Sequence, residues 1–163
     1  MKSKQLTVEH LWQCERIGTP SVSPDGKWVV VDQTTYSMDT NESATQLWMY
    51  STDGKTRKQL TSAGKKNTAP QWSPDGKAIA FCAKRDGDDA SQLYVIAPDG
   101  GEARRVTKLS NGVGSIRWFP DSKRIAAISW VWPDLTTDAQ QAKRRKEQKE
   151  SKVQAKVIEV DNY

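Results

Sequence analysis

The pattern of this chain is clearest in one stretch, Pro70-Gln71-Trp72-Ser73-Pro74-Asp75-Gly76-Lys77-Ala78-Ile79-Ala80-Phe81. Similar sequences stand on both sides of it, one beginning at Pro20 and the other at Ser115. The prolines that the three copies share lie at positions 24, 74 and 120, so the repeats are 50 and 46 residues long. Periods of this length are typical of propellers and other stacked repeats, in which each unit completes its core only against its neighbours.

The centre of each copy predicts a β-hairpin. Pro74 presets φ for the first corner of a type I turn, Asp75 suits the second corner, and Gly76 accepts the left-handed conformation that follows. In the third copy Ser122 replaces this glycine. A non-glycine residue in the left-handed region costs about 1–2 kcal/mol. We therefore expect the third turn either to change type or to be the weakest of the three.

The remainder of each repeat predicts two further strands joined by a tight turn. Leu47 and Leu93 are 46 residues apart, as are Leu60 and Val106, so the register holds through the second half of the repeat. The expected strands are 21–23, 28–35, 46–50 and 57–61 in the first repeat, with 92–96 and 103–107 closing the second. Each repeat therefore predicts a four-stranded antiparallel sheet, the unit of one propeller blade.

Residues 36–45 carry the four extra residues of the first repeat and are polar, so we expect an exposed loop there. Its Asn41-Glu42-Ser43 matches a glycosylation sequon, which chance also produces. By contrast, Ala78–Phe81 and Ile125–Ile128 are apolar without alternation. This is what a sheet packed between two neighbouring blades requires, and the alanines allow those sheets to approach closely.

The third repeat departs from the pattern after Trp130. Residues 136–155 are rich in Ala, Gln, Lys, Arg and Glu, which favour helix, and predict an inserted, largely solvated helix. Residues 157–163 then read as a strand that resumes the blade. Trp130 and Trp132 flank the departure and could face a substrate cavity, whereas Trp72 and Trp118 recur at the same repeat position, which indicates blade packing and not a ligand platform.

The predicted fold is an all-β partial propeller with two complete blades, the start of a third, and a charged helical insertion. The expected divisions are a lead-in segment at 1–18 with a short helix capped by Thr7, blade 1 at 19–64, blade 2 at 65–110, and partial blade 3 at 111–163. Two blades and a fraction cannot close a ring, and an open stack exposes sheet edges. We therefore expect the chain to be part of a larger protein.

The net charge of +5 comes from one segment. Between Lys143 and Lys156 there are seven Lys or Arg residues and two Glu, while the other basic and acidic residues cancel. Such a helix could contact phosphates, and that binding would weaken steeply with salt. No aromatic residues are interleaved within the run to stack on bases. The segment therefore predicts a solvated insertion, and no nucleic-acid partner is expected.

The sequence predicts no catalytic, metal-binding or cofactor-binding residue, and no cofactor. Cys14 and Cys82 form no C-x-x-C pair, and His10 is the single histidine and has no cysteine cluster at metal-ligand spacing. Residues 86–89 are acidic but lack the ligand pattern of a calcium loop. Apolar runs are too short to cross a membrane, so no membrane partner is expected. No signal peptide is visible, which favours the cytoplasm, or the periplasm if a leader was removed.

The motif at 70–81, with Leu93–Ile96 and the Pro-Asp-Gly-Gly-Glu turn at 98–102, resembles the propeller repeat of two groups of proteins. These are the TolB-like proteins and the N-terminal domains of prolyl oligopeptidase family serine peptidases. The lead-in Leu11 to Pro20, with its Ile-Gly-x-Pro, and the lysine-rich insertion resemble the acylaminoacyl-peptidase and dipeptidyl-peptidase branch. The resemblance implies a propeller that gates the access of short or N-blocked peptides. It also implies partners, namely the remaining blades and a C-terminal α/β-hydrolase domain, and allows a homo-oligomer.

The chain itself lacks the catalytic pattern of those peptidases. No Gly-x-Ser-x-Gly nucleophile elbow occurs, since residues 112–116 have the wrong spacing. His10 precedes nearly every serine and aspartate, whereas the peptidase histidine follows them. No triad residue is carried over, so this chain is expected to be inactive without a catalytic domain. The alternative is a TolB-like, non-enzymatic propeller scaffold for protein binding.

Overall fold

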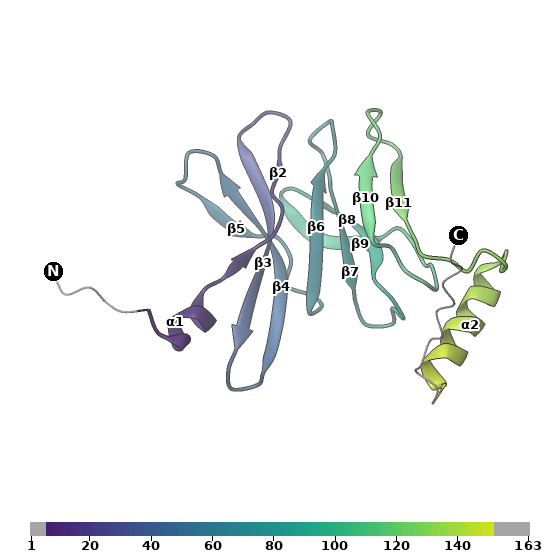
Figure 1. Cartoon of the computed structure of the whole chain (residues 1–163). Helices are drawn as coiled ribbons and strands as arrows, with labels where there is room; N and C mark the ends of the chain where they lie inside the picture. Colours follow the sequence, from purple (N-terminus) through teal and green to yellow (C-terminus); the bar gives the residue numbers. More distant parts are fainter. Residues whose placement is uncertain (1–5, 152–163) are drawn as a thin grey trace, which may run out of the picture.

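Small antiparallel sheets lie side by side along the chain in Figure 1, a computed structural model that describes residues 6–151. Blade 1 contains β2 (Ser21–Val22), β3 (Trp28–Ser37), β4 (Glu42–Ser51) and β5 (Arg57–Gln59). Blade 2 contains β6 (Lys66–Trp72), β7 (Ile79–Lys84), β8 (Gln92–Ala97) and β9 (Gly100–Arg105). Blade 3 begins with β10 (Ser115–Trp118) and β11 (Ile125–Ile128). The predicted partial propeller is confirmed.

The lead-in segment contributes a further strand to blade 1. β1 (Arg16–Ile17) pairs antiparallel with β3, next to the position where β2 pairs with the same strand. Blades 1 and 2 are also connected by a single parallel pairing between Thr45 and Lys66. The divisions at 19–64, 65–110 and from 111 onward remain predictions. The pairing of β1 with β3 crosses the boundary between the lead-in segment and blade 1, and the pairing of Thr45 with Lys66 crosses the boundary between blades 1 and 2.

The Pro-Asp turns form as predicted. Gly26 and Gly76 both have φ of 71°, and the Gly76 N–H donates to the Ser73 carbonyl at 2.9 Å. Ser122 adopts the same left-handed conformation with φ of 55°, and its N–H donates to the Phe119 carbonyl at 3.1 Å. The third turn therefore keeps the turn type of the other two, and the remaining alternative, that it is the weakest of the three, stays a prediction.

A serine before each of the first two prolines completes the turn. The Ser73 hydroxyl donates to Asp75 Oδ1 at 2.6 Å and accepts from the Ala78 N–H at 2.9 Å. The carboxylate also accepts from the Lys77 N–H at 3.1 Å. The same bonds recur at Ser23 and again at Ser51, in the turn between β4 and β5. Phe119 occupies this place in the third repeat and has no hydroxyl to offer.

The hydrophobic core lies between the blades. One cluster joins blade 1 to blade 2 and includes Leu47, Met49, Ile79 and Phe81. A second cluster joins blade 2 to blade 3 through Ala80, Cys82, Leu93, Val113 and Ile116. Alternate residues of β7 therefore face opposite neighbours, which confirms that its continuous apolar sequence reflects burial on both faces. On the outer side of blade 3, Ile128 is exposed.

The expected loop at 36–45 is wrong, because β3 and β4 pair from Trp28–Ser51 out to Ser37–Glu42. Only residues 38–41 form the turn, and Asn41 closes it with φ of 51°. The polar side chains here satisfy one another across the hairpin, as the Thr34 and Thr45 hydroxyls do at 2.9 Å. These polar residues therefore belong to an exposed hairpin that projects from the blade and not to an irregular loop (Figure 1).

Two helices flank the blades on the edge opposite the Pro-Asp turns (Figure 1). α1 (Val8–Gln13) has the predicted Thr7 N-cap, and α2 (Asp138–Glu150) is the predicted insertion, with only Gln141 buried. The helix ends at Glu150 with Ser151 as its C-cap, and residues 152–155 of the expected helix and the strand expected at 157–163 fall outside the described residues. Neither described helix is long and apolar enough to cross a membrane.

Candidate functional site

Three repeats meet at one pocket on their inner strands. β2, β6 and β10 are adjacent, since the Trp72 N–H donates to Ser21 Oγ at 3.1 Å and Trp118 Nε1 donates to the Gln71 carbonyl at 3.1 Å. A pocket of about 380 Å³ lies along β6 and β10 and the segment just before β2. Its lining residues are Gly18, Thr19, Asp32, Ala69, Pro70, Gln71, Ser115, Ile116 and Arg117. We call it the inner pocket.

Equivalent positions of all three repeats line the inner pocket. Thr19, Ala69 and Ser115 are 50 and 46 residues apart, the same spacings that separate the three prolines. The pocket is therefore a product of the repeat and lies where successive blades converge. The repeat spacing in the sequence shows that these three positions are equivalent, but nothing in the sequence indicates that they face a cavity.

The backbone of β6 is strained at Ala69, one of the residues that line the inner pocket. Ala69 has φ of 53°, a conformation that costs a non-glycine residue about 1–3 kcal/mol. It lies at a register shift between Thr68 and Gln71, where β6 bulges against β7. Bulges bend a strand and redirect side chains, and they are common beside functional sites. The bulge places Ala69 and the buried Pro70 at the pocket wall.

Charged groups of opposite sign line the same pocket. Asp32 comes from β3 and Arg117 from β10, so blades 1 and 3 each supply one. The Asp32 carboxylate lies against Gly18, where a Cβ would be 2.3 Å from Oδ2. The Gly18 N–H also donates to the Asp32 carbonyl at 2.8 Å. Glycine at 18 therefore makes room for this carboxylate, and the pocket can accept both a cationic and an anionic group.

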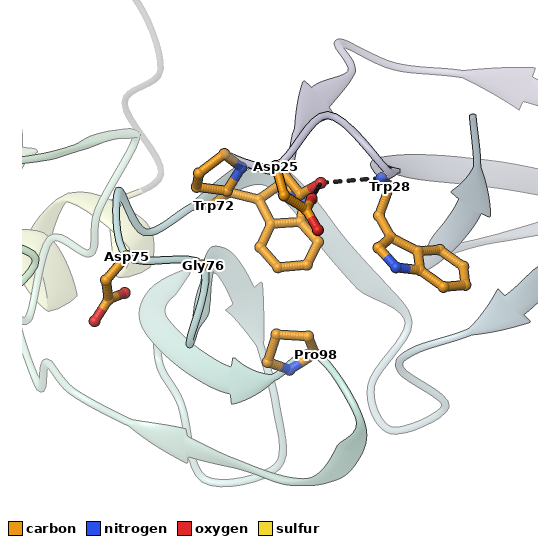
Figure 2. A pocket seen from close by; sticks show the side chains of 8 residues that line it. Asp25, Trp28, Trp72, Asp75, Gly76 and Pro98 are labelled. Atoms are coloured by element: carbon orange, nitrogen blue, oxygen red, sulfur yellow. Dashed lines mark hydrogen bonds between the residues drawn. The ribbon is translucent and has the colours of Figure 1, made fainter.

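A second pocket, of about 330 Å³, lies between the Pro-Asp turns of blades 1 and 2. Figure 2 shows the indoles of Trp28 and Trp72 and the ring of Pro98 around it. Asp25 and Asp75 are also at its edge, but each carboxylate is held within its own turn. Hydrogen bonds from Ser23 and the Lys27 N–H lower the pKa of Asp25, and the corresponding bonds lower that of Asp75. These carboxylates stabilise turns.

The residues that the sequence singled out have structural roles. His10 Nδ1 accepts from the Thr7 N–H at 3.1 Å and completes the cap of α1. Cys82 is buried, and burial raises the pKa of its thiol, while Cys14 is exposed and the two are not bonded. Trp72 packs in the core between blades 1 and 2, and Trp118 packs between blades 2 and 3. The packing interpretation of these two tryptophans is confirmed.

The acidic turn at 86–89 contains an ion pair that the sequence did not reveal. Asp88 accepts from Tyr94 OH at 2.6 Å and from Arg105 Nη1 at 2.6 Å. Burial alone would raise the pKa of Asp88, but the bonds from Tyr94 and Arg105 outweigh it and lower this pKa. Burial and the neighbouring carboxylate raise the pKa of Tyr94 to about 12. Asp88 therefore ties the end of β7 to β8 and β9.

α2 is docked through polar groups. The Gln141 amide donates to the carbonyls of Trp132 and Leu135, both at 2.8 Å, and its oxygen accepts from Asn111 and from the Trp132 N–H. At its first turn, Asp138 accepts from the N–H and the hydroxyl of Ser110. Trp130 is 83% exposed beside this helix. It lines a third pocket and does not reach the inner one.

Comparisons with known proteins agree with this architecture. The sequence pattern described as the TolB beta propeller domain matches residues 9–154. Dipeptidyl-peptidase 5 of Porphyromonas endodontalis is 38% identical over 87 residues, which are 53% of this chain and 13% of that protein. The chain thus spans about an eighth of the length of this relative.

Solved structures show the same fold at lower identity. Acylaminoacyl peptidase of Pyrococcus horikoshii aligns with a TM-score of 0.60 and 21% identity, over 76% of this chain and 20% of that one. A putative TolB of Agrobacterium tumefaciens aligns with a TM-score of 0.56 and 24% identity, over 72% of this chain and 39% of that one. Both peptidase propellers and TolB-like propellers are therefore structural neighbours of the blades described above.

Proposed function

The chain belongs to the TolB beta propeller family, and from this premise we propose that it forms part of the propeller of a serine peptidase. The peptidase would hydrolyse short or N-blocked peptides. The propeller would gate their access and dock on an α/β-hydrolase domain that carries the catalytic triad. The 38% identity to a dipeptidyl-peptidase supports a peptidase as the context of these blades.

The inner pocket is the observation that carries the gating role. It lies where three successive blades converge, and its uncharged lining residues are accompanied by one charged residue of each sign. A short peptide has an ammonium or blocked amine at one end and a carboxylate at the other. Asp32 and Arg117 have the charges to interact with such ends, and the attraction between a bound charge and an opposite charge is stronger in a partly enclosed site than in bulk water.

The proposed partners follow from the open faces of the stack. Ile128 at the outer side of blade 3 is 61% exposed, and Val22 in β2 is 55% exposed. Aliphatic residues at blade faces are usually covered by a neighbouring blade, as those of β7 are. Further blades of a larger protein would cover them, and a second copy of the protein is the other candidate.

Peptide hydrolysis tests the proposal. The protein produced from the uninterrupted reading frame that contains these residues should cleave dipeptidyl and N-acetyl-peptidyl anilides, and the 163-residue chain alone should not. Failure of the longer protein to cleave any of them, while it folds and closes its ring, would favour the non-enzymatic TolB-like scaffold. The TolB neighbour in the structural comparison is the observation behind that alternative.

Variants of the inner pocket test the gating role separately. Arg117→Gln removes the cation, and Gly18→Ala displaces the Asp32 carboxylate because the new Cβ occupies its place. Each should raise KM for short peptides several-fold and leave kcat nearly unchanged, as expected when binding is lost equally from ground and transition states. Arg104→Gln, on the outer strand β9, is the matched control. An active enzyme with unchanged KM in both pocket variants would refute the gating role.

A further inference from the structure

The third pocket lies between the 130–132 segment and α2. It has a volume of about 360 Å³ and is lined by Asn111, Trp130, Val131, Trp132, Arg145 and Gln148. We call it the Trp130 pocket. Neither the family nor the gating role assigns any purpose to it, and none of its residues lines the inner pocket.

The walls of the Trp130 pocket are fixed in place. Gln141 is 5% exposed and bonds to both the N–H and the carbonyl of Trp132, at 3.0 and 2.8 Å. The same amide oxygen accepts from Asn111 Nδ2 at 2.9 Å. One buried side chain therefore holds the helix, the tryptophan segment and the Asn111 loop together. A pocket that is already formed loses little conformational entropy when a ligand binds.

The cation of the pocket has no carboxylate partner. Arg145 Nη1 donates to the Ser110 carbonyl, and Nη2 approaches the Asp89 carbonyl at 3.4 Å. None of the ion pairs among residues 6–151 involves Arg145. A guanidinium has five N–H donors, so several remain available after these contacts. The two carbonyls orient the group without neutralising its charge.

The apolar side of the pocket is open to solvent. Trp130 is 83% exposed and Val131 is 62% exposed. Scattered exposed apolar residues are normal, but adjacent large ones beside a formed pocket mark interaction surfaces. Tryptophan and arginine are also the residues that most often dominate binding energy at such surfaces.

We propose that the Trp130 pocket binds an acidic peptide segment of a partner protein. A carboxylate of the segment pairs with Arg145, and an apolar side chain next to it packs on Trp130 and Val131. The charge of α2 favours an acidic ligand, since the helix contains five Lys or Arg residues but only three Asp or Glu residues between 138 and 150. An arginine fork matches a carboxylate with two parallel hydrogen bonds.

A nucleic acid is the less suitable ligand. Proteins that bind through the phosphate backbone commonly neutralise about six to ten phosphates. α2 has a net charge of only +2 over its described length, and Lys146 already lies 4.0 Å from Glu150. A pocket with two indoles, one valine and one arginine fits a few peptide side chains better than an extended polyanion.

Binding of a defined peptide to the 163-residue chain tests the proposal. The probe is acetyl-Asp-Glu-Leu-Phe-Asp-Glu-amide, measured by calorimetry and by the fluorescence change that covering Trp130 produces. One control peptide has every acidic residue replaced by its amide, and another has Leu and Phe replaced by Ser. The acidic apolar peptide should bind about tenfold more tightly than either control, because both the charge and the apolar contact contribute.

Protein variants locate the site. Trp130→Ser and Arg145→Gln should each weaken binding of the probe about tenfold. Arg144→Gln removes the same charge from the neighbouring position, which does not line the pocket, and should change the affinity less than about twofold. Circular dichroism of the variants controls for loss of α2, and Trp130→Ser, at an exposed position, keeps the test valid if Arg145→Gln unfolds the helix.

Three outcomes would overturn the proposal. Equal affinity for all three peptides would show that the pocket does not select them. Tight, steeply salt-dependent binding of fluorescein-labelled oligo(dT), with no binding of the peptide, would assign the surface to nucleic acid. No peptide binding, together with a fall of several degrees in Tm for Trp130→Ser, would show that the chain itself covers Trp130.

Discussion

The backbone N–H of Asp75 donates a 3.0 Å hydrogen bond to the side-chain hydroxyl of Ser122, 47 residues further along the chain. The two residues stand in the Pro-Asp turns of blades 2 and 3. The turn of blade 2 also meets that of blade 1, since a Cβ at Gly76 would lie 3.6 Å from Pro24 Cδ. Serine in place of glycine at position 122 therefore strains the backbone but supplies a hydrogen bond between blades 2 and 3.

Removing this hydroxyl should weaken the contact between blades 2 and 3. Ser122→Ala keeps the strained φ and loses the bond, so we expect the free energy of unfolding to fall by about 1 kcal/mol. Urea unfolding of the 163-residue chain measures it. Ser43→Ala, at an exposed position in β4, is the control and should change this free energy by less than about 0.5 kcal/mol. An equal effect of both substitutions would mean that the Asp75–Ser122 bond contributes nothing.

The buried serine of the second turn should matter more than its counterpart at Ser51. Ser73 is 1% exposed, and Ser73→Ala leaves the Ala78 N–H without its acceptor inside the protein. We expect a loss of about 1–2 kcal/mol in the free energy of unfolding. Ser51 makes the same bonds but is less buried, so water can replace its hydroxyl and Ser51→Ala should cost less. The opposite order in urea unfolding would contradict this account of the turn.

Acid should destabilise the fold through its turn aspartates. Hydrogen bonds from the serine hydroxyls and from the N–H groups that follow lower the pKa of Asp25, Asp53 and Asp75, and bonds from Lys123 N–H and Arg124 lower that of Asp121. A lowered folded-state pKa stabilises the fold above the unfolded value of about 3.9, and this stability is lost as pH falls through the folded value.

Thermal unfolding at a series of pH values checks this dependence. Tm should be nearly constant from about pH 7 to pH 5 and should fall below about pH 4. Ser73→Ala removes the largest cause of the lowered Asp75 pKa, so its Tm should fall less steeply than that of the unchanged protein. A Tm that stays level or rises below about pH 4 would show that these carboxylates do not stabilise the folded state.

Removing either partner of the Asp88–Arg105 ion pair should lower the free energy of unfolding. Asp88→Asn leaves Arg105 without its partner, and we expect a loss of about 2 kcal/mol, less than for a fully buried pair because the Arg105 side chain is 37% exposed. Arg105→Met leaves the Asp88 carboxylate, at 1% side-chain exposure, and should cost at least as much. A double-mutant cycle in urea measures the coupling between the two residues. Additive losses would mean that no coupling exists.

The turns and the blade core could be predicted because their signals are local or periodic. The ring of Pro74 fixes φ, Gly76 permits the positive φ that the turn requires, and Leu47 and Leu93 repeat at the 46-residue spacing. The hairpin at 36–45 was missed because its side chains are mostly polar, so no clear alternation of apolar and polar residues distinguishes it from a loop. Asn41, a residue that tolerates positive φ, was the one available signal of a tight turn.

The inner pocket and the Trp130 pocket could not be predicted, since each depends on residues far apart in the chain. Asp32, Ala69 and Arg117 meet only because the blades converge. Trp130 meets Arg145 only because Gln141 docks α2 on the 132–135 segment. The basic run has no aromatic residues interleaved within it. The fold supplies an aromatic neighbour from the segment before the helix.

The gating proposal is tested most directly by the size of the substrates that are cleaved. The rate of hydrolysis of a short anilide peptide by the protein of the complete reading frame is compared with the rate for the same sequence within a long, unfolded polypeptide. A propeller that gates access predicts rapid cleavage of the short peptide and little or no cleavage of the long chain. Equal rates per cleavable bond would contradict gating, whatever the peptidase activity of the protein.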